Sequence, residues 1–401
     1  MVEWKNIGEI GSYFSGLTGK TKDDFQDGNA KFITYMNVFS NPSLDVNSTG
    51  VVKINEGEKQ NKIQRGDVLF TGSSETPDEA GMSCVVTDDL EGDFYMNSFC
   101  FGLRLNTPDL YNLHFLKHVL RSDSIRKSIA KTASGVTRFN ISKARFSNIQ
   151  IPIPSLSEQN RIVGILDTFT ASIENLKEQI TQRRKQFNWY LDKLYYATKA
   201  DLLDASNKGE VIIKSFDEIG TFTRGRRFVR TDIVPEGVPC IHYGDMYTHY
   251  GVRAEETPTH LTKEKAKKLR FATKGDVVIV AAGENDLDIG VGVAWLGEED
   301  VVIHDACFIF KHNMNPKYLS YFMRSMNYHQ QIRMGVVDGK ICSISAKELG
   351  RTLIAVPSSE EQSRIVSILD TFEASIANLE AQLSQREKQY EYYRNKLLTF
   401  E

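Results

Sequence analysis

The chain has 401 residues, more than most single hydrophobic cores contain, and this length predicts at least two domains. Hydrophobic residues make up 41% and charged residues 25%, a composition that excludes disorder for most of the chain. The formal net charge of −3 excludes a uniformly basic protein, although it is compatible with a local basic surface.

The cysteines and the N-terminal residues bear on the cellular compartment. The five cysteines are scattered and form no CxxC pair, so neither a zinc site nor a disulfide framework is predicted. The stretch MVEWKNIGEIGSYF lacks the pattern of a signal peptide, and no run of about 18 apolar residues could cross a bilayer. We therefore expect a cytoplasmic protein without a metal site or membrane contact.

Residues 1–153 are predicted to form a first globular domain. The runs DVLFTG (67–72) and FCFGLRL (99–105) are bounded by turn residues and indicate β-strands. The stretch 111–131 indicates helical structure. Strands followed by helices predict a mixed α+β domain.

Residues 154–196 are predicted to form one long helix. Pro154 and Ser155, with Glu158 three residues after the serine, have the pattern of a capping box. Apolar residues then recur at steps of three and four, which is typical of a coiled-coil seam. The seam positions are Ile162, Leu166, Phe169, Ile173, Leu176 and Ile180.

The polar segment 197–210 is predicted to be a linker, and residues 211–356 a second globular domain. This second domain repeats landmarks of the first: EIGSYFSG returns as EIGTFTRG, and RGDVLFTG as KGDVVIVA. The two domains should therefore share an α+β fold while their loops differ.

Residues 357–401 repeat the long helix. Pro357 follows Pro154 by 203 residues, and about 25 of about 41 aligned positions are identical, which excludes chance similarity. The second seam consists of Ile365, Leu369, Phe372, Ile376, Leu379 and Leu383. We expect the two helices to pair as an antiparallel coiled coil with pseudo-twofold symmetry. Arg183 and Arg386 occupy one skipped seam position each, either with the charged group in solvent or as a register lock.

Basic and polar loops of both domains are candidates for contacts to DNA. The stretch TFTRGRRFVR places four arginines around a glycine, and guanidinium groups can bind phosphates or guanine edges. The candidate DNA-binding residues are Lys20, Lys22, Tyr35, Ser73, Ser74, Arg138, Arg224, Arg226, Arg227, Arg230, Tyr243, Glu284, Asn285 and Lys340. The competing interpretation is that these are solvated surface charges and ordinary turns.

No catalytic motif is found. The sequence contains no GxGxxG after a strand, no GxxxxGK[ST], no HExxH and no GxSxG. His304, Asp305 and Cys307 in VVIHDACFIF could suggest a thiol nucleophile, but strand alternation would place His304 on the face opposite Cys307. A half-buried strand is the preferred interpretation of this stretch.

At IPIPSLSEQNRIVGILDTF and IAVPSSEEQSRIVSILDTF, the chain closely resembles the specificity subunit of type I restriction-modification systems. The order of domain, helix, domain, helix matches that family from residue 1 to residue 401. The resemblance implies a non-catalytic subunit with two target recognition domains. Each domain would read one half of a bipartite, asymmetric sequence in double-stranded DNA, and the helix pair would set the spacing between the halves.

The resemblance also implies partners. Family members bind two methyltransferase subunits and two restriction subunits, so S-adenosylmethionine, ATP and Mg are expected on those partners and no cofactor on this chain. The docking surface would include Phe187, Trp189, Tyr190, Tyr390, Tyr392 and Tyr393, unless these rings pack within the helix pair.

Two other functions are compatible with the residues themselves. The chain could be a non-catalytic coiled-coil scaffold with two modules that bind carbohydrate or peptide, and such binding would not depend on salt as DNA binding does. An enzyme that uses Cys307 would be inactivated by a thiol reagent.

Overall fold

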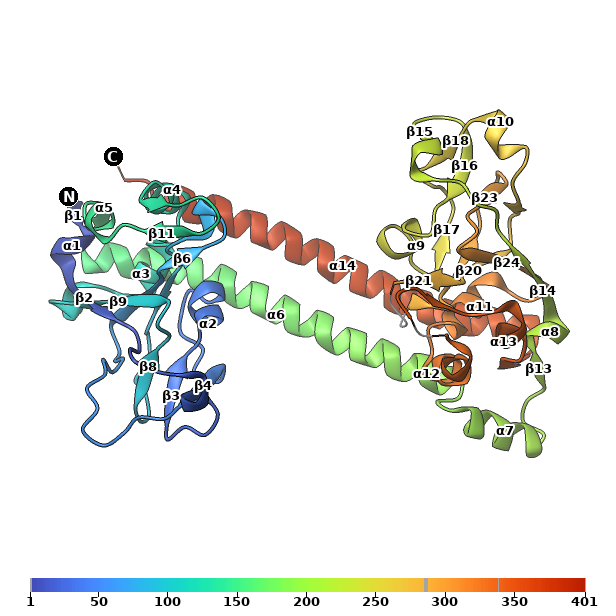
Figure 1. Cartoon of the computed structure of the whole chain (residues 1–401), viewed down its shortest axis with the longest axis horizontal. Coiled ribbons are helices and arrows are strands. Elements are labelled where there is room, and N and C mark those ends of the chain that lie inside the picture. Colours follow the sequence, from blue (N-terminus) through green and yellow to red (C-terminus); the bar gives the residue numbers. More distant parts are fainter. Residues whose placement is uncertain (1, 285–287, 338, 401) are drawn as a thin grey trace. The chain divides into compact units, whose positions relative to one another are not determined.

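The computed structural model describes residues 2–284, 288–337 and 339–400. The chain forms two compact units. Unit 1 consists of Met1–Lys177 and Ala381–Glu401, and unit 2 consists of Glu178–Glu380. The boundary between the units cuts both long helices, α6 (Leu156–Leu194) and α14 (Ser359–Leu397), which are drawn in green and red in Figure 1. Each globular domain is therefore completed by the start of one long helix and the end of the other.

Unit 1 contains four small sheets. The largest has the order β2-β9-β5-β7 and is antiparallel throughout. A second sheet, β4-β3-β8, pairs β3 with β8 in parallel. The other two are β10-β11-β6 and β1-β12. The strands are β1 (Glu3–Asn6), β2 (Gly11–Ser15), β3 (Ala30–Ile33), β4 (Thr49–Val52), β5 (Asp67–Thr71), β6 (Ser73–Ser74), β7 (Ser83–Val85), β8 (Phe94–Met96), β9 (Cys100–Leu105), β10 (Ala133–Ser134), β11 (Phe139–Ile141) and β12 (Gln150–Ile153).

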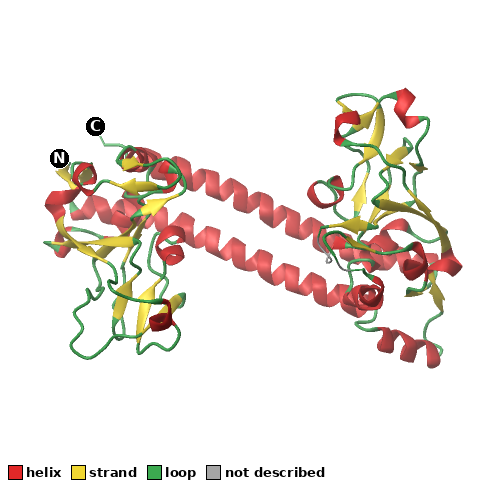
Figure 2. Cartoon of the chain, viewed as in Figure 1, coloured by secondary structure: helices red, strands yellow, loops and turns green. Residues whose placement is uncertain are grey.

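Short helices connect these strands, so that the predicted α+β class is confirmed for this unit (Figure 2). The stretch expected to be helical after β9 divides into two helices, α3 and α4. The helices are α1 (Ile7–Ile10), η1 (Lys22–Phe25), α2 (Tyr35–Ser40), η2 (Pro77–Glu79), η3 (Pro108–Leu110), α3 (Leu113–Val119), α4 (Asp123–Ala130) and α5 (Lys143–Phe146).

In the part of unit 2 that the structure describes, the chain forms two five-stranded sheets and two strand pairs. The sheets have the orders β14-β24-β20-β22-β17 and β15-β18-β16-β23-β19, and the pairs are β13-β26 and β21-β25. Strands β16 and β23 pair in parallel, as β3 and β8 do in unit 1. The strands are β13 (Ile213–Ser215), β14 (Gly220–Arg224), β15 (Ile233–Val234), β16 (Val238–Ile241), β17 (Arg253–Ala254), β18 (His260–Leu261), β19 (Phe271–Ala272), β20 (Val277–Val280), β21 (Ala282–Gly283), β22 (Gly292–Trp295), β23 (Val301–Ile303), β24 (Cys307–His312), β25 (Cys342–Ser343) and β26 (Leu353–Ala355).

The helices of unit 2 also follow the pattern of unit 1, with a pair, α11 and α12, after the last long strand. They are α7 (Lys199–Asn207), α8 (Phe216–Ile219), η4 (Arg230–Asp232), α9 (Asp245–Thr248), α10 (Lys263–Ala266), α11 (Pro316–Phe322), α12 (Met326–Ile332), η6 (Arg333–Gly335) and α13 (Ala346–Gly350). In the residues that the structure describes, no helix combines the length and the apolar character needed to cross a membrane.

The long helices contribute to the cores of the globular domains. Ile162 and Leu166 of α6 are fully buried in one apolar cluster with Phe115 and Ile151 of unit 1, and Leu398 joins the same cluster. In unit 2, Ile365 and Leu369 of α14 are buried with Leu191 of α6 and with Tyr195, which directly follows α6. These seam positions therefore also pack against the domains, which the heptad pattern alone did not predict.

The two helices pair in antiparallel fashion within each unit. In unit 1, Phe169 stacks on Tyr393 with 5.3 Å between ring centroids, and Lys177 lies 3.6 Å from the carboxylate of Glu387. In unit 2, Arg184 lies 2.6 Å from the carboxylate of Glu380, and Tyr190 lies 5.1 Å from the ring of Phe372. Residue numbers rise along α6 as they fall along α14 in both units.

The remaining seam residues are at least half-buried. Ile173, Leu176 and Ile180 of α6 are buried, whereas the seam positions of α14 beyond Leu369 are half-buried. Arg183 and Arg386 place their guanidinium groups over the rings of Phe372 and Phe169, at 5.8 and 5.6 Å from the centroids. The skipped seam positions are therefore filled by matched cation–π contacts.

A repeated glutamine joins each globular domain to its long helix. Gln159 accepts a hydrogen bond from the backbone N–H of Asn112 at 2.8 Å and donates one to the carbonyl of Pro154 at 2.8 Å. Gln362 repeats both bonds with Asn315 and Pro357, each at 2.9 Å. The glutamine that follows Glu158 or Glu361 thus ties the start of each long helix to its globular domain.

The glutamate before each of these glutamines does not complete the predicted capping box. Ser155 accepts a hydrogen bond from the N–H of Glu158 at 3.4 Å, which is half of the predicted capping box. The Glu158 carboxylate, however, pairs with Arg161 at 2.7 Å. Glu361 likewise pairs with Arg364 at 2.6 Å. The arginine one turn on offers a charged partner, which competes with the backbone N–H.

The segment 197–210, expected to be a linker, contains helix α7. Thr198 caps this helix by accepting a hydrogen bond from the N–H of Asp201 at 3.1 Å. Leu202 and Ala205 are buried and fix the helix to unit 2. The polar composition did not indicate this helix, because its apolar face has two buried residues, Leu202 and Ala205.

Candidate nucleic-acid interface

Three of the predicted residues of unit 1 line one pocket, and a fourth, Ser73, contacts two of them. Tyr35 starts α2, Ser73 and Ser74 form β6, and Arg138 precedes β11. The Tyr35 hydroxyl donates to the carbonyl of Ser73 at 2.8 Å. A pocket of about 430 Å³ is lined by Tyr35, Ser74 and Arg138 together with Glu79. Residues from three separate stretches of sequence therefore converge on one polar surface.

The side chain of Arg138 is held in place within this surface. Its Nε donates to the Ser73 hydroxyl at 2.9 Å, and its guanidinium lies 5.1 Å from the ring centroid of the exposed Phe99. Glu79 accepts a hydrogen bond from Ser74 at 3.3 Å. An oriented guanidinium beside hydroxyl groups is suited to bind a base edge or a phosphate.

The two predicted lysines of unit 1 differ in their environment. The Lys20 side chain is only 6% exposed, and its ammonium lies 2.6 Å from the Glu58 carboxylate. Hydrogen bonds, first of all from Lys20, lower the pKa of Glu58 to about 2. The charge of Lys20 is thus paired within the domain, which argues against a DNA contact, and its role stays a prediction. Lys22 is exposed in η1, and its role stays a prediction.

The predicted arginines of unit 2 are exposed. Arg224 donates to the carbonyl of Asp305 at 2.8 Å, and Arg226 donates to the carbonyl of Lys268 at 2.8 Å. These bonds orient two guanidinium groups beside β14 and the loop that follows. Arg227 and Arg230 are exposed on the same stretch. The four side chains form a local basic surface on a chain whose net charge is −3.

Unit 2 also has a pocket, which lies at the end of this basic stretch. It has a volume of about 470 Å³ and is lined by Arg230, Tyr243, Asp245 and His242 among others. Arg230 and Tyr243 were predicted, whereas His242 was not. Tyr243 follows strand β16 as Tyr35 follows β3, and both strands have a parallel partner. The two tyrosines thus occupy matched positions, each at a pocket.

Four rings gather behind this pocket. His242 lies 4.8 Å from His304 and 4.6 Å from Tyr243, and Phe228 lies 5.0 Å from His304, measured between ring centroids. Burial, more than the nearby charges, lowers the pKa of both histidines. This cluster could not be predicted from sequence, because the parallel pairing of β16 and β23 brings the two histidines together.

The other predictions for unit 2 concern the loops next to the β21-β25 pair. Glu284 and Lys340 are exposed in these loops, and neither lines the pocket of Arg230. Asn285 lies outside the described residues. The β21-β25 pair corresponds to the β6-β11 pair of unit 1, so these loops match the pocket of Arg138 in position.

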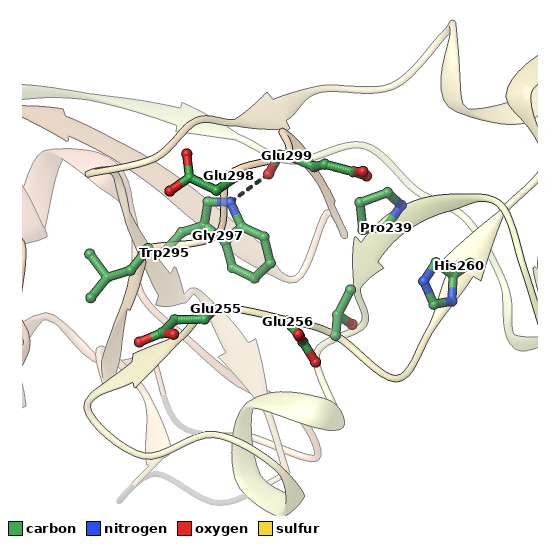
Figure 3. A pocket seen from close by; sticks show the side chains of 10 residues that line it. Pro239, Glu255, Glu256, His260, Trp295, Gly297, Glu298 and Glu299 are labelled. Carbon is green, nitrogen blue, oxygen red and sulfur yellow. Dashed lines mark hydrogen bonds between the residues drawn. The ribbon is translucent and has the colours of Figure 1, made fainter.

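A further pocket of unit 2, of about 540 Å³, has the opposite charge. Glu255, Glu256, Glu298 and Glu299 surround it, and Figure 3 shows their carboxylates around Trp295. Trp295 donates to the carbonyl of Glu299 at 2.9 Å. Four carboxylates repel phosphate groups, so the charge of this pocket does not favour phosphate binding.

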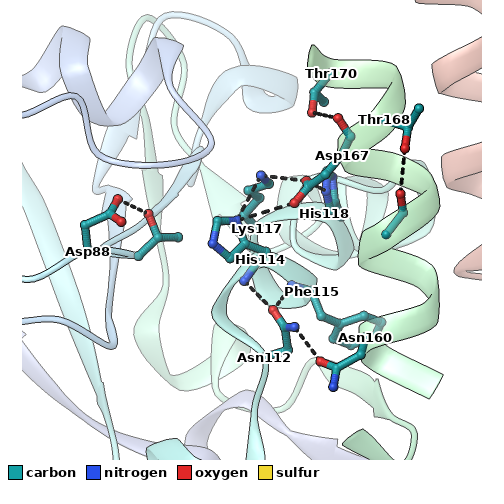
Figure 4. A network of polar contacts seen from close by, with 12 residues as sticks. Asp88, Asn112, His114, Phe115, Lys117, His118, Asn160, Asp167, Thr168 and Thr170 are labelled. Carbon is teal, nitrogen blue, oxygen red and sulfur yellow. Dashed lines mark hydrogen bonds and ion pairs between the residues drawn. The ribbon is translucent and has the colours of Figure 1, made fainter. Parts of the chain in front are cut away.

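A polar network holds the unit 1 domain against α6 (Figure 4). His118 of α3 lies 2.9 Å from Asp167, and Lys117 also lies 2.9 Å from that carboxylate. The second ring nitrogen of His118 lies 2.9 Å from the Tyr390 hydroxyl of α14. Burial favours a higher pKa for Asp167, but the hydrogen bonds from His118 and Lys117 outweigh it and lower the pKa to about 2.

Unit 2 replaces this network with a simpler one. Asp370, the repeat of Asp167, accepts a hydrogen bond from Tyr321 at 2.7 Å and forms an ion pair with Lys317. Tyr321 stands at the position of His118 in the repeat. The carboxylate on the long helix is thus common to both units, whereas its partners differ.

Two half-buried arginines were not among the residues predicted from sequence. Arg121 donates to the carbonyl groups of Val38, Phe39, Asn41 and Ser83, all within 3.1 Å. Its repeat, Arg324, donates to the carbonyls of Gly292, Ser320 and Gly251. Burial lowers the pKa of each to about 10. The dipeptide Arg-Ser, which recurs 203 residues later, was the available signal.

The stretch around Cys307 does not form one continuous strand. Strand β23 ends at Ile303 and β24 begins at Cys307, with a turn between them in which Ala306 donates to His304 Nδ1 at 3.1 Å. The predicted strand alternation is therefore wrong at His304. Burial raises the pKa of the Cys307 thiol to about 12, which opposes a role as nucleophile.

Comparisons with known proteins agree with this arrangement. Residues 1–183 and 209–387 each match the type I restriction modification DNA specificity domain. A putative type I restriction enzyme specificity subunit of Haemophilus influenzae is 29% identical over 324 residues, which are 77% of each chain. The specificity subunit of an Escherichia coli type I restriction enzyme is 30% identical over 275 residues, covering 64% of this chain and 65% of the relative.

Solved structures show the same fold. The S subunit of a type I restriction-modification system from M. genitalium superposes with a TM-score of 0.52 at 17% identity, covering 100% of this chain and 97% of that one. A chain from a study of complex assembly in the type I R-M system gives a TM-score of 0.64 at 18% identity and covers 99% and 97%. The chain belongs to the family of type I restriction-modification specificity subunits.

Proposed function

We propose that this chain reads a bipartite, asymmetric sequence in double-stranded DNA, with one globular domain for each half. The observation that carries the proposal is the double match to a DNA specificity domain, in two copies whose polar pockets differ. Arg138 with Ser73 would serve one half, and the stretch from Arg224 to Arg230 the other. Different side chains at matched positions would give the two halves different sequences.

The helices α6 and α14 would set the distance between the halves. Each has 39 residues and is continuous across the unit boundary. A helix of this length extends about 60 Å, more than the roughly 34–36 Å of one turn of DNA. The number of unread base pairs would then be a property of helix length.

The chain would supply recognition, and its partners the chemistry. We propose two methyltransferase subunits and two restriction subunits as partners in the cytoplasm, with S-adenosylmethionine, ATP and Mg bound to them. Trp189 and Tyr392 are matched by the repeat, are more than half exposed, and each lies beside a lysine one turn on. Two like surfaces on one chain would accommodate two copies of one methyltransferase.

Mapping of methylated adenines tests the proposal. The chain is combined with its cognate methyltransferase subunit and S-adenosylmethionine, and genomic DNA is sequenced for methylation. Two short blocks of sequence with a fixed gap are the expected result, and binding should weaken steeply between about 50 and 200 mM salt. Methylation without any motif, or binding that is insensitive to salt, would favour the scaffold instead.

A further inference from the structure

The pocket of unit 2 that contains Arg230 presents hydrogen-bond donors from a fixed position. His242 follows strand β16, and its backbone N–H donates to Asp245 Oδ2 at 3.0 Å. The ring is packed against Tyr243 and His304, at 4.6 and 4.8 Å between centroids. The imidazole is therefore oriented before any ligand arrives.

The hydrogen bond of the His242 ring determines which of its two nitrogens carries the proton. Nδ1 accepts a hydrogen bond from the N–H of Gly244 at 3.3 Å. A neutral ring whose Nδ1 accepts carries its proton on Nε2. Burial lowers the pKa of His242, which favours the neutral ring.

His304 behaves as a support rather than as a second reader. Its Nδ1 accepts from the N–H of Ala306 at 3.1 Å, and its Nε2 lies 3.0 Å from the carbonyl of Phe228. Both ring nitrogens thus have partners within the protein. His304 fixes the ring of His242 but has no nitrogen left to offer a ligand.

The charges around the pocket favour a base edge over a phosphate. Asp245 lines the pocket, and its Oδ2 accepts from the backbone of His242 and, at 3.0 Å, from the hydroxyl of Thr259. A carboxylate repels phosphate, whereas it can accept from the amino group of cytosine. Arg230, exposed at the rim, adds a second donor group beside His242.

We propose that Arg230 and His242 read the edge of a guanine in one half of the target, with Asp245 facing its paired cytosine. In the major groove guanine offers two acceptors, N7 and O6, whereas adenine offers one acceptor and one donor. Two protein donors therefore match guanine and leave a donor opposed to a donor at adenine. This inference rests on the proposed function and names the base that this pocket selects.

Two conservative variants of His242 separate reading from structural support. The amide nitrogen of Gln reaches the position of histidine Nε2, and the amide of Asn reaches that of Nδ1. The wild-type chain, His242→Gln, His242→Asn and Arg230→Ala are each combined with the cognate methyltransferase subunit and S-adenosylmethionine. Adenine methylation of genomic DNA is then scored at every single-base variant of the motif.

We expect His242→Gln to keep the wild-type preference. His242→Asn and Arg230→Ala should both relax the same G·C position of one half by about 5- to 100-fold. The other half should be unchanged in every variant, which also reports that the chain is folded. Arg230→Ala alters an exposed side chain, so it remains informative if a His242 variant fails to fold.

Three results would overturn the inference. A uniform loss of methylation at all sequences would identify a phosphate contact. If His242→Asn kept the preference for the G·C position and His242→Gln lost it, His242 would have a structural role through Nδ1. An unchanged motif in all variants would remove the pocket from recognition. In each case the wild-type chain still shows a bipartite motif, whereas failure of the proposed function would leave the wild type without one.

Discussion

Replacing Gln362 with Ala should loosen the contact between the globular domain of unit 2 and α14. The side chain is buried and makes hydrogen bonds to Asn315 and Pro357, both at 2.9 Å. Its loss leaves a backbone N–H and a carbonyl without these partners. Removal of two such bonds from a buried site costs about 3 kcal/mol, which corresponds to roughly a 100-fold change in a local opening equilibrium.

Hydrogen exchange measured by mass spectrometry tests this magnitude. Peptides that cover Asn315 and α11 should exchange about 100-fold faster in Gln362→Ala, while peptides of α3 stay unchanged. Gln159→Ala should reverse the pattern, since Gln159 makes the matched bonds in unit 1. Gln182→Ala serves as the control, because this exposed glutamine on α6 donates a hydrogen bond to Glu178 of its own helix, at 2.9 Å.

An acceleration of less than about threefold in the peptides that contain Asn315 would contradict this role of Gln362. Equal acceleration of α3 and α11 in Gln362→Ala would also refute it. That result would mean that the repeated glutamine stabilises the chain as a whole and does not hold one domain to one helix.

Three further predictions concern stability and DNA binding. Burial lowers the pKa of His312 to about 4, below the value of about 6.5 in the unfolded chain. The neutral ring therefore contributes fully to the stability of unit 2 above pH 6.5, and this stability is lost as the pH falls towards 4. Denaturant unfolding of the wild type should show unit 2 losing about 2 kcal/mol between pH 7 and pH 5, and His312→Gln should lose less. Leu369→Ala should cost about 2–5 kcal/mol in urea unfolding, and Leu369→Asp should prevent unit 2 from folding, whereas the half-buried Leu383 should tolerate Ala at lower cost. Arg226→Ala should weaken DNA binding or relax one half of the target, while Arg253→Ala, beside Glu255 of the acidic pocket, should leave binding unchanged in a fluorescence titration.

The helices and the fold class could be predicted from sequence because their signals are local or repeated. The seam from Ile162 to Ile180 has a regular spacing, and its return 203 residues later removes the ambiguity of a single pattern. The strand runs are short, bounded by turn residues and continuous in apolar character, and β5 and β9 lie where they were expected. Spacing of this kind does not depend on distant parts of the chain.

The candidate site was less predictable because it depends on contacts between distant residues. Lys20 looks like a free charge in sequence, but its partner Glu58 lies 38 residues away. His242 and His304 meet only because β16 and β23 pair in parallel. Arg138 was predicted as a DNA contact, yet its orientation by Ser73 and Phe99 was not visible in sequence. Residue types suggested the surface, and only topology identified the pockets.

The placement of residues 381–400 in unit 1 has a consequence for synthesis of the chain. Leu398 is buried in the core of the first domain, and Tyr390 contacts His118 there. Residues 1–177 leave the ribosome long before these partners exist, because all of unit 2 is made in between. At about 5–20 residues per second, roughly 200 residues take about 10–40 s. The globular domain of unit 1 is thus translated before that of unit 2 and completed after it, and until then its apolar surface for the second long helix is open to chaperones.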